Sequence, residues 1–410
     1  MSKKKILLIG TFDTKADELG FMKQCLEGEN AQVITMDVGI LAKGVARTDI
    51  SNDDVAAAAG STIPAIAAIG DENEAMANMA EGASNLARSL YAEGKLDGMI
   101  ALGGSMGTDL ALDVAGALPV GVPKFVVSTI SFSHLLPPDR IPADVMMILW
   151  SGGLYGLNSL CKAALSQACG AVVGAARAVV APDARRAMVG MTSLGKSCLK
   201  YMVALKPELE QRGFEVAVFH STGMGGRAFA DLAAKGRFAL VLDLCLQEVA
   251  NDLGGSVVTS GKSRLKAAAG AGVPQIVAPG ATDMVDFESW KAMPKRFEGR
   301  PYHAHNRLIA SVTTPAEDRR VLARHVAAEL ADAKGPVTFI LPNKGIQQWD
   351  KADEPLHDPE GLAAFVDEAR KAIKTPVELV EIDAHINDQA FVDAVLHKVD
   401  QWLAQGVVKA

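Results

Sequence analysis

Aromatic side chains are scarce in this sequence: Phe, Trp and Tyr account for 5% of its 410 residues, although hydrophobic residues as a whole reach 49%. A core of small aliphatic side chains suits closely packed parallel strands that are covered by helices. The chain is also too long for one ordinary core. We therefore expect an α/β protein of more than one domain.

Basic charge, long apolar runs and patterned cysteines are lacking as well. The formal net charge is −7, and no clustered basic excess of the kind that grips a nucleic-acid backbone is present. No segment reaches the roughly 18 uninterrupted apolar residues of a membrane span, and the apolar run that starts at Ile6 is too short for a signal peptide. The five cysteines form no C-x-x-C pair, which indicates reduced thiols. We expect a cytoplasmic protein without nucleic-acid or membrane partners.

Short apolar runs alternate with helical stretches along almost the whole chain, a pattern that predicts parallel sheets with crossover helices. Strands are expected near residues 5–10, 32–37, 98–102, 124–129 and 145–149, and then near 187–191, 214–220, 239–244, 275–279, 337–341 and 377–382. The fold class is therefore α/β, with two Rossmann-like domains, residues 1–180 and 185–410, each with a mainly parallel sheet and helices on both faces. Thr11–Lys15 and Thr192–Lys196 follow the first strand of each half, which suggests two similar units with a ligand cleft between them.

The turns after three strands of the first half gather hydroxyl, charged and glycine residues. In open parallel sheets ligands lie beyond the carboxyl ends of the strands, where helix N-termini direct free N–H groups at an anion. Gly10–Lys15 combines two hydroxyls, a carboxylate and an ammonium, Gly103–Asp109 contains three glycines, and Ser128–His134 contains four hydroxyls. Helix capping or simple turns explain each motif singly. Together they predict a site for a phosphorylated small molecule.

The second half offers imidazoles and carboxylates at strand ends, which can bind Mg²⁺ or act as acid and base. The candidate catalytic residues are His220, Asp243, Glu248, Asp252 and His305. Candidate anion- or substrate-binding residues are Thr222, Gly223, Gly225, Gly226, Gly254, Gly255, Arg264 and Asn306. Nothing in the spacing fixes a zinc site, so the identity of any metal stays open.

Residues Gly190–Ser197 match the P-loop pattern G-x-x-x-x-G-K-[ST] between a predicted strand and a predicted helix. A glycine-rich chain of this length meets the pattern by chance at about the per-cent level. A phosphotransferase that uses Lys196 and Ser197 is therefore kept as a lesser alternative.

Several of these motifs, in this order, carry a family resemblance. They include Gly10–Lys15, Met36–Gly39, Gly103–Thr108, Val127–Thr129, His220–Gly226, Leu242–Leu244, Gly254–Gly255, Pro279–Val285 and His305–Asn306. Over nearly its whole length the chain resembles the Tm-one-like ATP-binding family, named after the nucleotide-binding domain of a plant tobamovirus-resistance protein. The resemblance implies two Rossmann-like domains, ATP binding by the first, association into dimers or larger homo-oligomers, and a functional link to a TIM-barrel partner. The implied nucleotide-binding residues are Thr11, Asp13, Thr14, Lys15, Gly103, Gly104, Ser105, Gly107, Thr108, Ser128 and Thr129.

The chain departs from the family pattern at two loops. Met106 stands where the family has a small Gly, and Phe132 lies in a turn that is small and glycine-containing in the family. These bulky side chains could narrow the approach for phosphates, so the ligand is ATP or another phosphorylated molecule. We expect an enzyme or enzyme subunit (a hydrolase, lyase or ATP-dependent enzyme) that acts on a small acidic metabolite in the cleft between the domains. The alternative is a non-catalytic nucleotide-binding module that regulates a partner.

Overall fold

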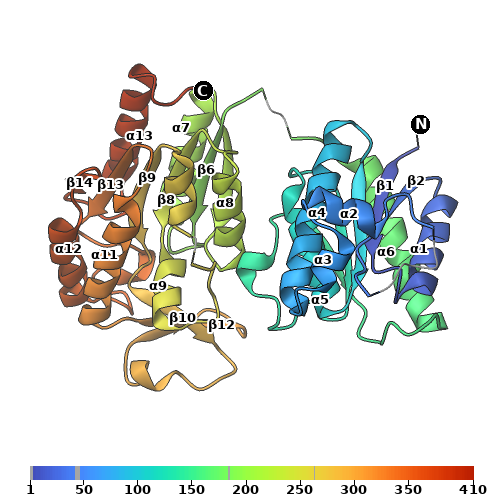
Figure 1. The fold of residues 1–410 in the computed structure, drawn as a ribbon. Coiled ribbons are helices and arrows are strands. Elements are labelled where there is room, and N and C mark those ends of the chain that lie inside the picture. The colour runs from blue at the N-terminus through green and yellow to red at the C-terminus, as the bar shows by residue number, and fades with distance from the viewer. Residues whose placement is uncertain (1–2, 42–46, 183–184, 263) are drawn as a thin grey trace. The chain divides into compact units, whose positions relative to one another are not determined.

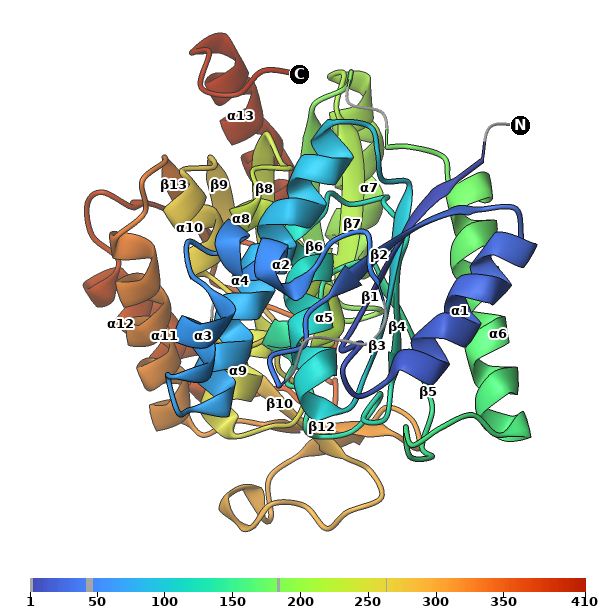
Figure 2. The same cartoon turned by 45° about the vertical axis from the view of Figure 1, so that its right-hand side comes forward.

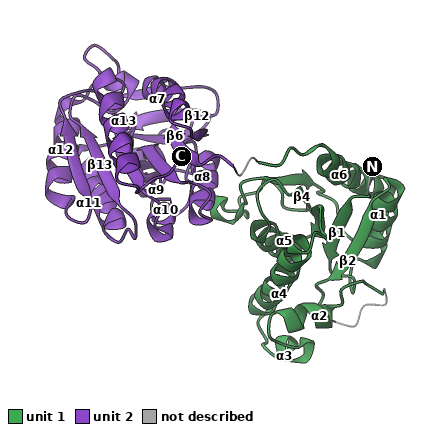
Figure 3. Cartoon of the chain, turned by 90° about the horizontal axis from the view of Figure 1, so that it is seen from above, with its two compact units in different colours: residues 1–182 green, residues 183–410 purple. Residues whose placement is uncertain are grey.

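The computed structural model describes residues 3–41, 47–182, 185–262 and 264–410. The chain divides into two compact units, residues 1–182 and 183–410 (Figure 3). Each unit has its own parallel β-sheet with helices on both faces. The predicted α/β class is confirmed.

Unit 1, which begins with the blue strands β1 and β2 in Figure 1, is built on five parallel strands in the order β2-β1-β3-β4-β5. Their bounds are β1 (Lys5–Gly10), β2 (Gln32–Asp37), β3 (Gly98–Gly103), β4 (Lys124–Ser128) and β5 (Val145–Leu149). The chain lays β2 on one side of β1 and then returns to place β3 on the other side. The carboxyl ends of β1 and β3 therefore form a topological switch point, where ligands of such sheets bind.

The helices of unit 1 lie on the two faces of this sheet. They are α1 (Ala16–Gly28), α2 (Asn52–Ala58), α3 (Ile63–Ala67), α4 (Glu72–Ala92), α5 (Ser105–Ala117) and α6 (Ser159–Ala178), with a 3-10 turn η1 at Pro138–Arg140. Side chains alternate along a strand, so Ile6 and Leu8 of β1 pack with α1 and α6, while Leu7 and Ile9 pack with α4 and α5. Figure 2 shows α1 beside α6 and, on the other side of the sheet, α4 beside α5.

Among the described residues, α6 is the one helix whose length and composition would suffice to cross a membrane. Its side chains Leu165, Cys169 and Val173 are fully buried against the sheet face that Ile6 and Leu8 form. The apolar character of α6 is therefore explained by its place in the core of unit 1.

Unit 2 has a six-stranded parallel sheet in the order β14-β13-β9-β8-β6-β7. Its strands are β6 (Met188–Ser193), β7 (Glu215–His220), β8 (Leu240–Cys245), β9 (Gln275–Gly280), β13 (Val337–Pro342) and β14 (Glu378–Ile382). The first five follow the same spatial order as those of unit 1, and the switch point again falls between the first and third strands, here β6 and β8. The shared order agrees with the suggestion of two similar units.

Helices cover both faces of the second sheet. They are α7 (Leu199–Gln211), α8 (Met224–Ala234), α9 (Gln247–Gly254), α10 (Lys266–Ala271), α11 (Ala316–Ala331), α12 (Pro359–Ala372) and α13 (Gln389–Ala404), with 3-10 turns η2 (Lys295–Phe297) and η3 (Gln348–Asp350). Side chains of α7 and α13 form the core on one face, and those of α8 to α12 form the core on the other.

A small antiparallel sheet of order β10-β12-β11 lies beside α9 in unit 2 (Figure 1). Its strands are β10 (Met284–Glu288), β11 (Tyr302–Ala304) and β12 (Ile309–Thr313), and the alternation of residues did not reveal them in the sequence. Val285 and Phe287 of β10 point into the apolar core with α9 and α11. Asp286 points to the opposite face and pairs across the strands with Ser311. This sheet therefore has one apolar face and one polar face.

Candidate functional site

A cavity of about 370 Å³ lies at the switch point of unit 1. It is lined by Thr11, Asp13, Thr14, Lys15, Ile40, Leu41, Glu72, Met76 and the segment from Leu102 to Gly107. The loops that follow β1 and β3 thus meet on one rim, as expected from the topology. This volume lies within the range of about 300–1,000 Å³ that small-molecule sites occupy.

Two helix starts face this cavity without a side-chain cap. The N-cap residues are Lys15 for α1 and Gly104 for α5, and neither accepts a cap hydrogen bond. The first amides of a helix are then free to bind an anion, and the helix dipole favours one there. A Cβ at Gly103 would lie 2.6 Å from the Cα of Gly107, so the tight turn into α5 requires glycine. Lys15 adds a cation whose Nζ lies 3.2 Å from Oγ1 of Thr14.

Two aspartates organise the other side of the cavity. Asp37 is buried and its Oδ1 accepts the amides of Phe12 at 3.0 Å and Gly39 at 2.9 Å, which ties the loops after β1 and β2 together. Burial raises the pKa of Asp37 above its ordinary value. Asp13 lines the cavity, and its Oδ2 accepts the amide of Leu41 at 3.1 Å. The other oxygen of Asp13, Oδ1, is buried and has no partner among the described residues.

Met106 and Phe132, the two bulky side chains that depart from the family pattern, leave the cavity open. Met106 forms part of its wall and is 39% exposed. Phe132 is 80% exposed and does not line the cavity. Phe132 has a φ of 64°, a left-handed conformation that favours glycine.

Three of the implied nucleotide-binding residues lie outside this lining. Thr108 and Ser128 are buried, and their hydroxyl oxygens lie 2.6 Å apart. The Oγ of Ser128 also accepts the amide of Ile130. Thr129 joins the loop through its amide, which donates to the carbonyl of Gly103. Thr108 and Ser128 fix the loops after β3 and β4, so we correct their assignment from ligand contacts to loop supports. The ligand contact of Thr129 stays a prediction.

A second cavity, of about 60 Å³, lies at the switch point of unit 2. It is lined by Leu194, Gly195, Lys196, Ser197, His220, Thr222, Gln247, Met284, Asp286, His305, Ile309, Ser311 and Trp349. Loops after β6 and β7 and the start of α9 form one side. The polar face of the small antiparallel sheet forms the other. Of the candidate residues in the second half, His220, Thr222 and His305 meet here.

Asp286 is a buried carboxylate of this cavity that is not among the candidate catalytic residues of the sequence analysis. Its oxygens accept from Gln247 Nε2 at 3.0 Å, Asn251 Nδ2 at 3.2 Å and Ser311 Oγ at 2.6 Å. Burial raises the pKa of Asp286, and the three donors oppose that rise. The sequence signal was weak because the carboxylate interrupts an otherwise apolar strand.

The basic side chains of the cavity are solvent-accessible. Lys196 and His305 are exposed, and Nδ1 of the exposed His220 lies 3.4 Å from the carbonyl oxygen of Ser193. His303 stacks on Trp349 with 4.2 Å between ring centroids, and burial lowers its pKa.

Asp243, Glu248 and Arg264 form a buried ion-pair network away from this cavity. The guanidinium of Arg264 donates to both oxygens of Asp243 and to Oε2 of Glu248. The Oε1 of Glu248 accepts the amides of Gly223 at 2.5 Å and Gly226 at 3.1 Å. The glycine nest at the start of α8 is therefore already occupied by an internal carboxylate. We correct the catalytic assignment of Asp243 and Glu248, and the anion-binding assignment of Arg264, Gly223 and Gly226, to structural roles.

The remaining second-half candidates also have structural explanations. A Cβ at Gly225 would lie 1.9 Å from the carbonyl oxygen of His220, so this glycine permits close packing. Gly254 and Gly255 end α9, and the C-terminus of a helix presents carbonyl oxygens that repel anions. Asp252 is exposed and accepts from Thr259 Oγ1 at 3.3 Å. Asn306 accepts two amides of its own turn, those of Leu308 and Ile309.

The P-loop interpretation is wrong on geometric grounds. Strand β6 extends to Ser193, so the first four residues of the pattern are β-strand and cannot wrap a phosphate. A Cβ at Gly190 would lie 2.6 Å from the ring of Phe238, which explains this glycine by packing. Lys196 nevertheless lines the second cavity.

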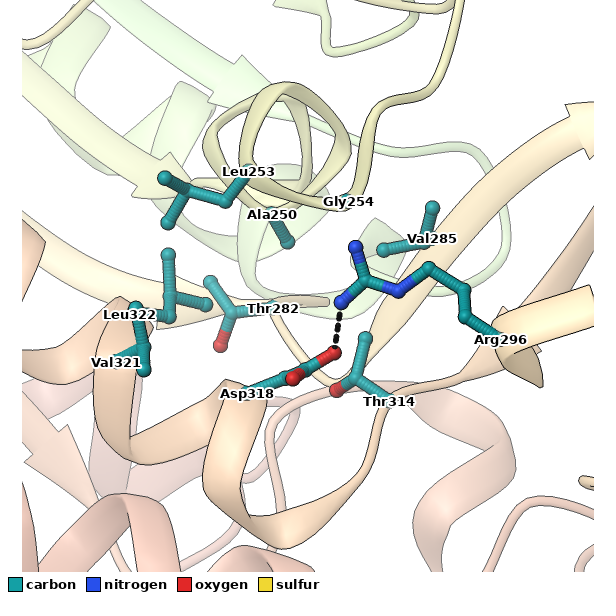
Figure 4. Close-up of a pocket in the computed structure, with 10 residues that line it drawn as sticks. All are labelled: Ala250, Leu253, Gly254, Thr282, Val285, Arg296, Thr314, Asp318, Val321 and Leu322. Carbon is teal, nitrogen blue, oxygen red and sulfur yellow. Dashed lines mark hydrogen bonds and ion pairs between the residues drawn. The ribbon is translucent and has the colours of Figure 1, made fainter. Parts of the chain in front are cut away.

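A third cavity, of about 100 Å³, separates α9 from α11 (Figure 4). Its walls are mainly aliphatic, and Arg296 reaches across it to an ion pair with Asp318. Gly254 lies at its edge, where a Cβ would be 2.6 Å from Cγ2 of Val285. Arg296 and Asp318, the charged residues of this lining, neutralise each other. We therefore interpret this cavity as a packing feature.

Within residues 3–41, 47–182, 185–262 and 264–410, no group of three or more His, Cys, Asp or Glu side chains is arranged to hold a metal ion.

Comparison with known proteins gives matches over the whole chain. The models of the "Uncharacterised protein family (UPF0261)" match with their N-terminal domain at residues 4–181 and their C-terminal domain at residues 186–403. A UPF0261 protein of Brucella suis is 57% identical over 404 residues, covering 98% of this chain and 97% of the relative. One of Clostridium tetani is 34% identical and covers 97% of this chain and 98% of the relative.

A plant relative and a solved structure complete the comparison. The ToMV susceptible protein tm-1 of Solanum lycopersicum is 28% identical over 97% of this chain, which spans 55% of the tomato protein. The crystal structure of Acinetobacter baumannii MurG covers 97% of this chain and is itself covered completely, at 12% identity and a TM-score of 0.23, which is too low to support an argument.

Proposed function

The chain belongs to the UPF0261 family, and on that premise we propose that unit 1 binds a nucleotide, with ATP as the first candidate. The protein is then an enzyme or enzyme subunit that uses this nucleotide while it acts on a small acidic metabolite. One observation carries the proposal: two uncapped helix starts and Lys15 converge on a 370 Å³ cavity at the switch point of the sheet. The tomato relative supports the resemblance to the Tm-one-like family.

The chemistry of the lining fits a nucleotide along its length. Lys15 and the amides that open α5 would hold phosphates, since charge-assisted hydrogen bonds to an oxyanion are the strong ones. The apolar side chains of Ile40, Met76 and Met106 offer a surface for a base. The unpartnered Oδ1 of Asp13 is an acceptor for a ribose hydroxyl.

The lining of the cavity also contains carboxylates that could hold a Mg²⁺ ion bound to the nucleotide phosphates. Mg²⁺ is typically held by one or two carboxylates together with the phosphates. Asp13 and Glu72 are the carboxylates in the lining. We propose that any Mg²⁺ enters with the phosphates.

The family resemblance extends the proposal beyond the single chain. We propose a cytoplasmic homo-oligomer, a dimer or larger, that acts together with a TIM-barrel protein. The tomato relative is nearly twice as long as this chain, which spans 55% of it. The part of the tomato protein that this chain does not span is the place to look for such a partner.

Calorimetric titration with ATP, ADP and AMP, with and without Mg²⁺, tests nucleotide binding. Lys15→Ala is expected to weaken ATP binding by about tenfold to a hundredfold, because a hydrogen bond to a charged group contributes about 1.5–3 kcal/mol. Lys95→Ala is the matched control, since Lys95 is an exposed lysine paired with Glu93. Equal losses in the two variants, or no binding of any nucleotide to the wild type, would refute the site.

A phosphate-release assay separates the two versions of the function. An ATP-dependent enzyme releases phosphate when its acidic substrate is present. A non-catalytic regulatory module binds ATP and releases none.

A further inference from the structure

We propose that the cavity of unit 2 binds a small 2-hydroxycarboxylate. The inference deepens the metabolite part of the proposed function and does not need the nucleotide. It rests on four features of the described residues: the size of the cavity, its nitrogen-bearing side chains, one unpartnered buried acceptor and an apolar wall.

The size of the cavity limits the ligand. A water molecule needs about 10–15 Å³ measured in this way, so a cavity of about 60 Å³ takes about four to six waters. A carboxylate with two or three carbon atoms and one hydroxyl occupies comparable space. A whole nucleotide does not fit.

Three nitrogen-bearing side chains of the lining favour an anion. Lys196 lines the cavity and has no ion pair or hydrogen bond among the described residues. Nδ1 of His220 faces the carbonyl oxygen of Ser193, which favours the tautomer with a proton on Nδ1 and leaves Nε2 available to the ligand. His305 contributes a second exposed imidazole.

Two buried acceptors of the lining require a hydrogen-bond donor from the ligand. Gln247 is 1% exposed and donates through Nε2 to Asp286, which fixes its amide with Oε1 as the remaining group. That Oε1 is buried without a partner in the described part of the chain. Oδ2 of Asp286 accepts only the amide of Asn251 and retains capacity for a second donor. A ligand hydroxyl would satisfy either acceptor.

The combination distinguishes a hydroxycarboxylate from phosphate. A phosphate group brings several acceptor oxygens, which would face the carboxylate of Asp286. The amides that could hold it at the start of α8 are taken by Glu248. The carbon skeleton of a hydroxy acid can instead lie against Met284, Ile309 and Trp349.

Calorimetry on the full chain without nucleotide tests the ligand class with three-carbon probes. Lactate carries both groups, propionate lacks the hydroxyl, and propane-1,2-diol lacks the carboxylate. We expect lactate to bind at least tenfold more tightly than propionate, and the diol and inorganic phosphate not to bind. The inference would be overturned if lactate bound no more tightly than propionate. It would also be overturned if no lactate binding were detected at a lactate concentration of about 10 mM, tenfold above a Kd of about 1 mM.

Two variants test the site itself. Lys196→Ala should weaken lactate and propionate about tenfold alike, because it removes the cation that both carboxylates contact. Gln247→Met should reduce the preference for lactate over propionate and leave propionate unchanged. Lys200→Ala, an exposed lysine one turn along in α7, is the control. Since Lys196 is exposed, its variant keeps the fold even where Gln247→Met does not, and an unchanged lactate affinity in Lys196→Ala would place binding elsewhere.

The two proposals fail separately. Lactate binding with no ATP binding removes the nucleotide proposal only. ATP binding that depends on Lys15, with no lactate binding, removes this inference only.

Discussion

Asp283 is expected to make the stability of unit 2 fall as the pH rises. It is 1% exposed, its Oδ2 accepts from Gln347 Nε2 at 3.0 Å, and its Oδ1 has no partner among the described residues. Burial raises its pKa to about 6, an effect that Arg319 opposes and Asp350 reinforces. In the unfolded chain an aspartate titrates near 3.9. The folded state therefore holds the proton more tightly than the unfolded state does.

The sign and size of the effect follow from proton linkage. Because the pKa of Asp283 is higher in the folded state, its contribution is fully present below about pH 4 and is lost as the pH rises through about 6. At 1.36 kcal/mol for each unit of difference, the complete loss is about 3 kcal/mol. About 1.5 kcal/mol of this falls between about pH 5 and 8. Asp283→Asn cannot titrate, so its free energy of unfolding should lack this decline.

Urea unfolding followed by tryptophan fluorescence measures this difference. Placing both proteins in a Trp150→Phe background leaves tryptophans only in unit 2, at Trp290, Trp349 and Trp402. Asp383→Asn serves as the control, because that carboxylate is 76% exposed. If wild type and Asp283→Asn show parallel pH profiles, Asp283 does not titrate in this range and the reasoning is refuted.

Three further predictions concern stability and are checked by urea unfolding at pH 7. Arg264→Met leaves two buried carboxylates without their counterion and should cost about 3–5 kcal/mol; a loss below about 1 kcal/mol would contradict the network. Gly254→Ala should cost about 1–3 kcal/mol because its Cβ would collide with Val285. Gly270→Ala meets nothing within 4 Å and should be neutral or stabilising, so equal effects would contradict the packing argument. Phe132→Gly should stabilise unit 1 or leave it unchanged, since it relieves a positive φ; a clear loss would show that the exposed ring makes a contact of its own.

Most of the main strands could be predicted because each is a short apolar run, and an apolar run can be recognised without knowledge of the strands that pair with it. The small antiparallel sheet could not. Its strands are three to five residues long, and Asp286 interrupts the apolar residues of β10, which lines the cavity together with β12. Helix α9 is hard to predict from the sequence for a related reason: its buried side includes Gln247, Glu248 and Asn251, so it lacks an apolar stripe.

The convergence of loops could be foreseen from topology, but the use of each polar group could not. Thr11 and Lys15 follow β1 and line the cavity, as strand ends should. Thr108 and Ser128 follow neighbouring strands as well, yet they satisfy each other. Whether a hydroxyl meets a ligand or another side chain depends on packing distances of a few tenths of an ångström, which the sequence does not display.

The carboxylate of Glu248 at the start of α8 has a consequence for how the two units respond to their surroundings. A helix start that carries its own counter-charge is expected to be indifferent to phosphate in solution, however abundant, whereas the bare starts of α1 and α5 are expected to attract it. Exchanging Glu248 for a shorter neutral residue would free the amides of Gly223 and Gly226 to compete for the same anions.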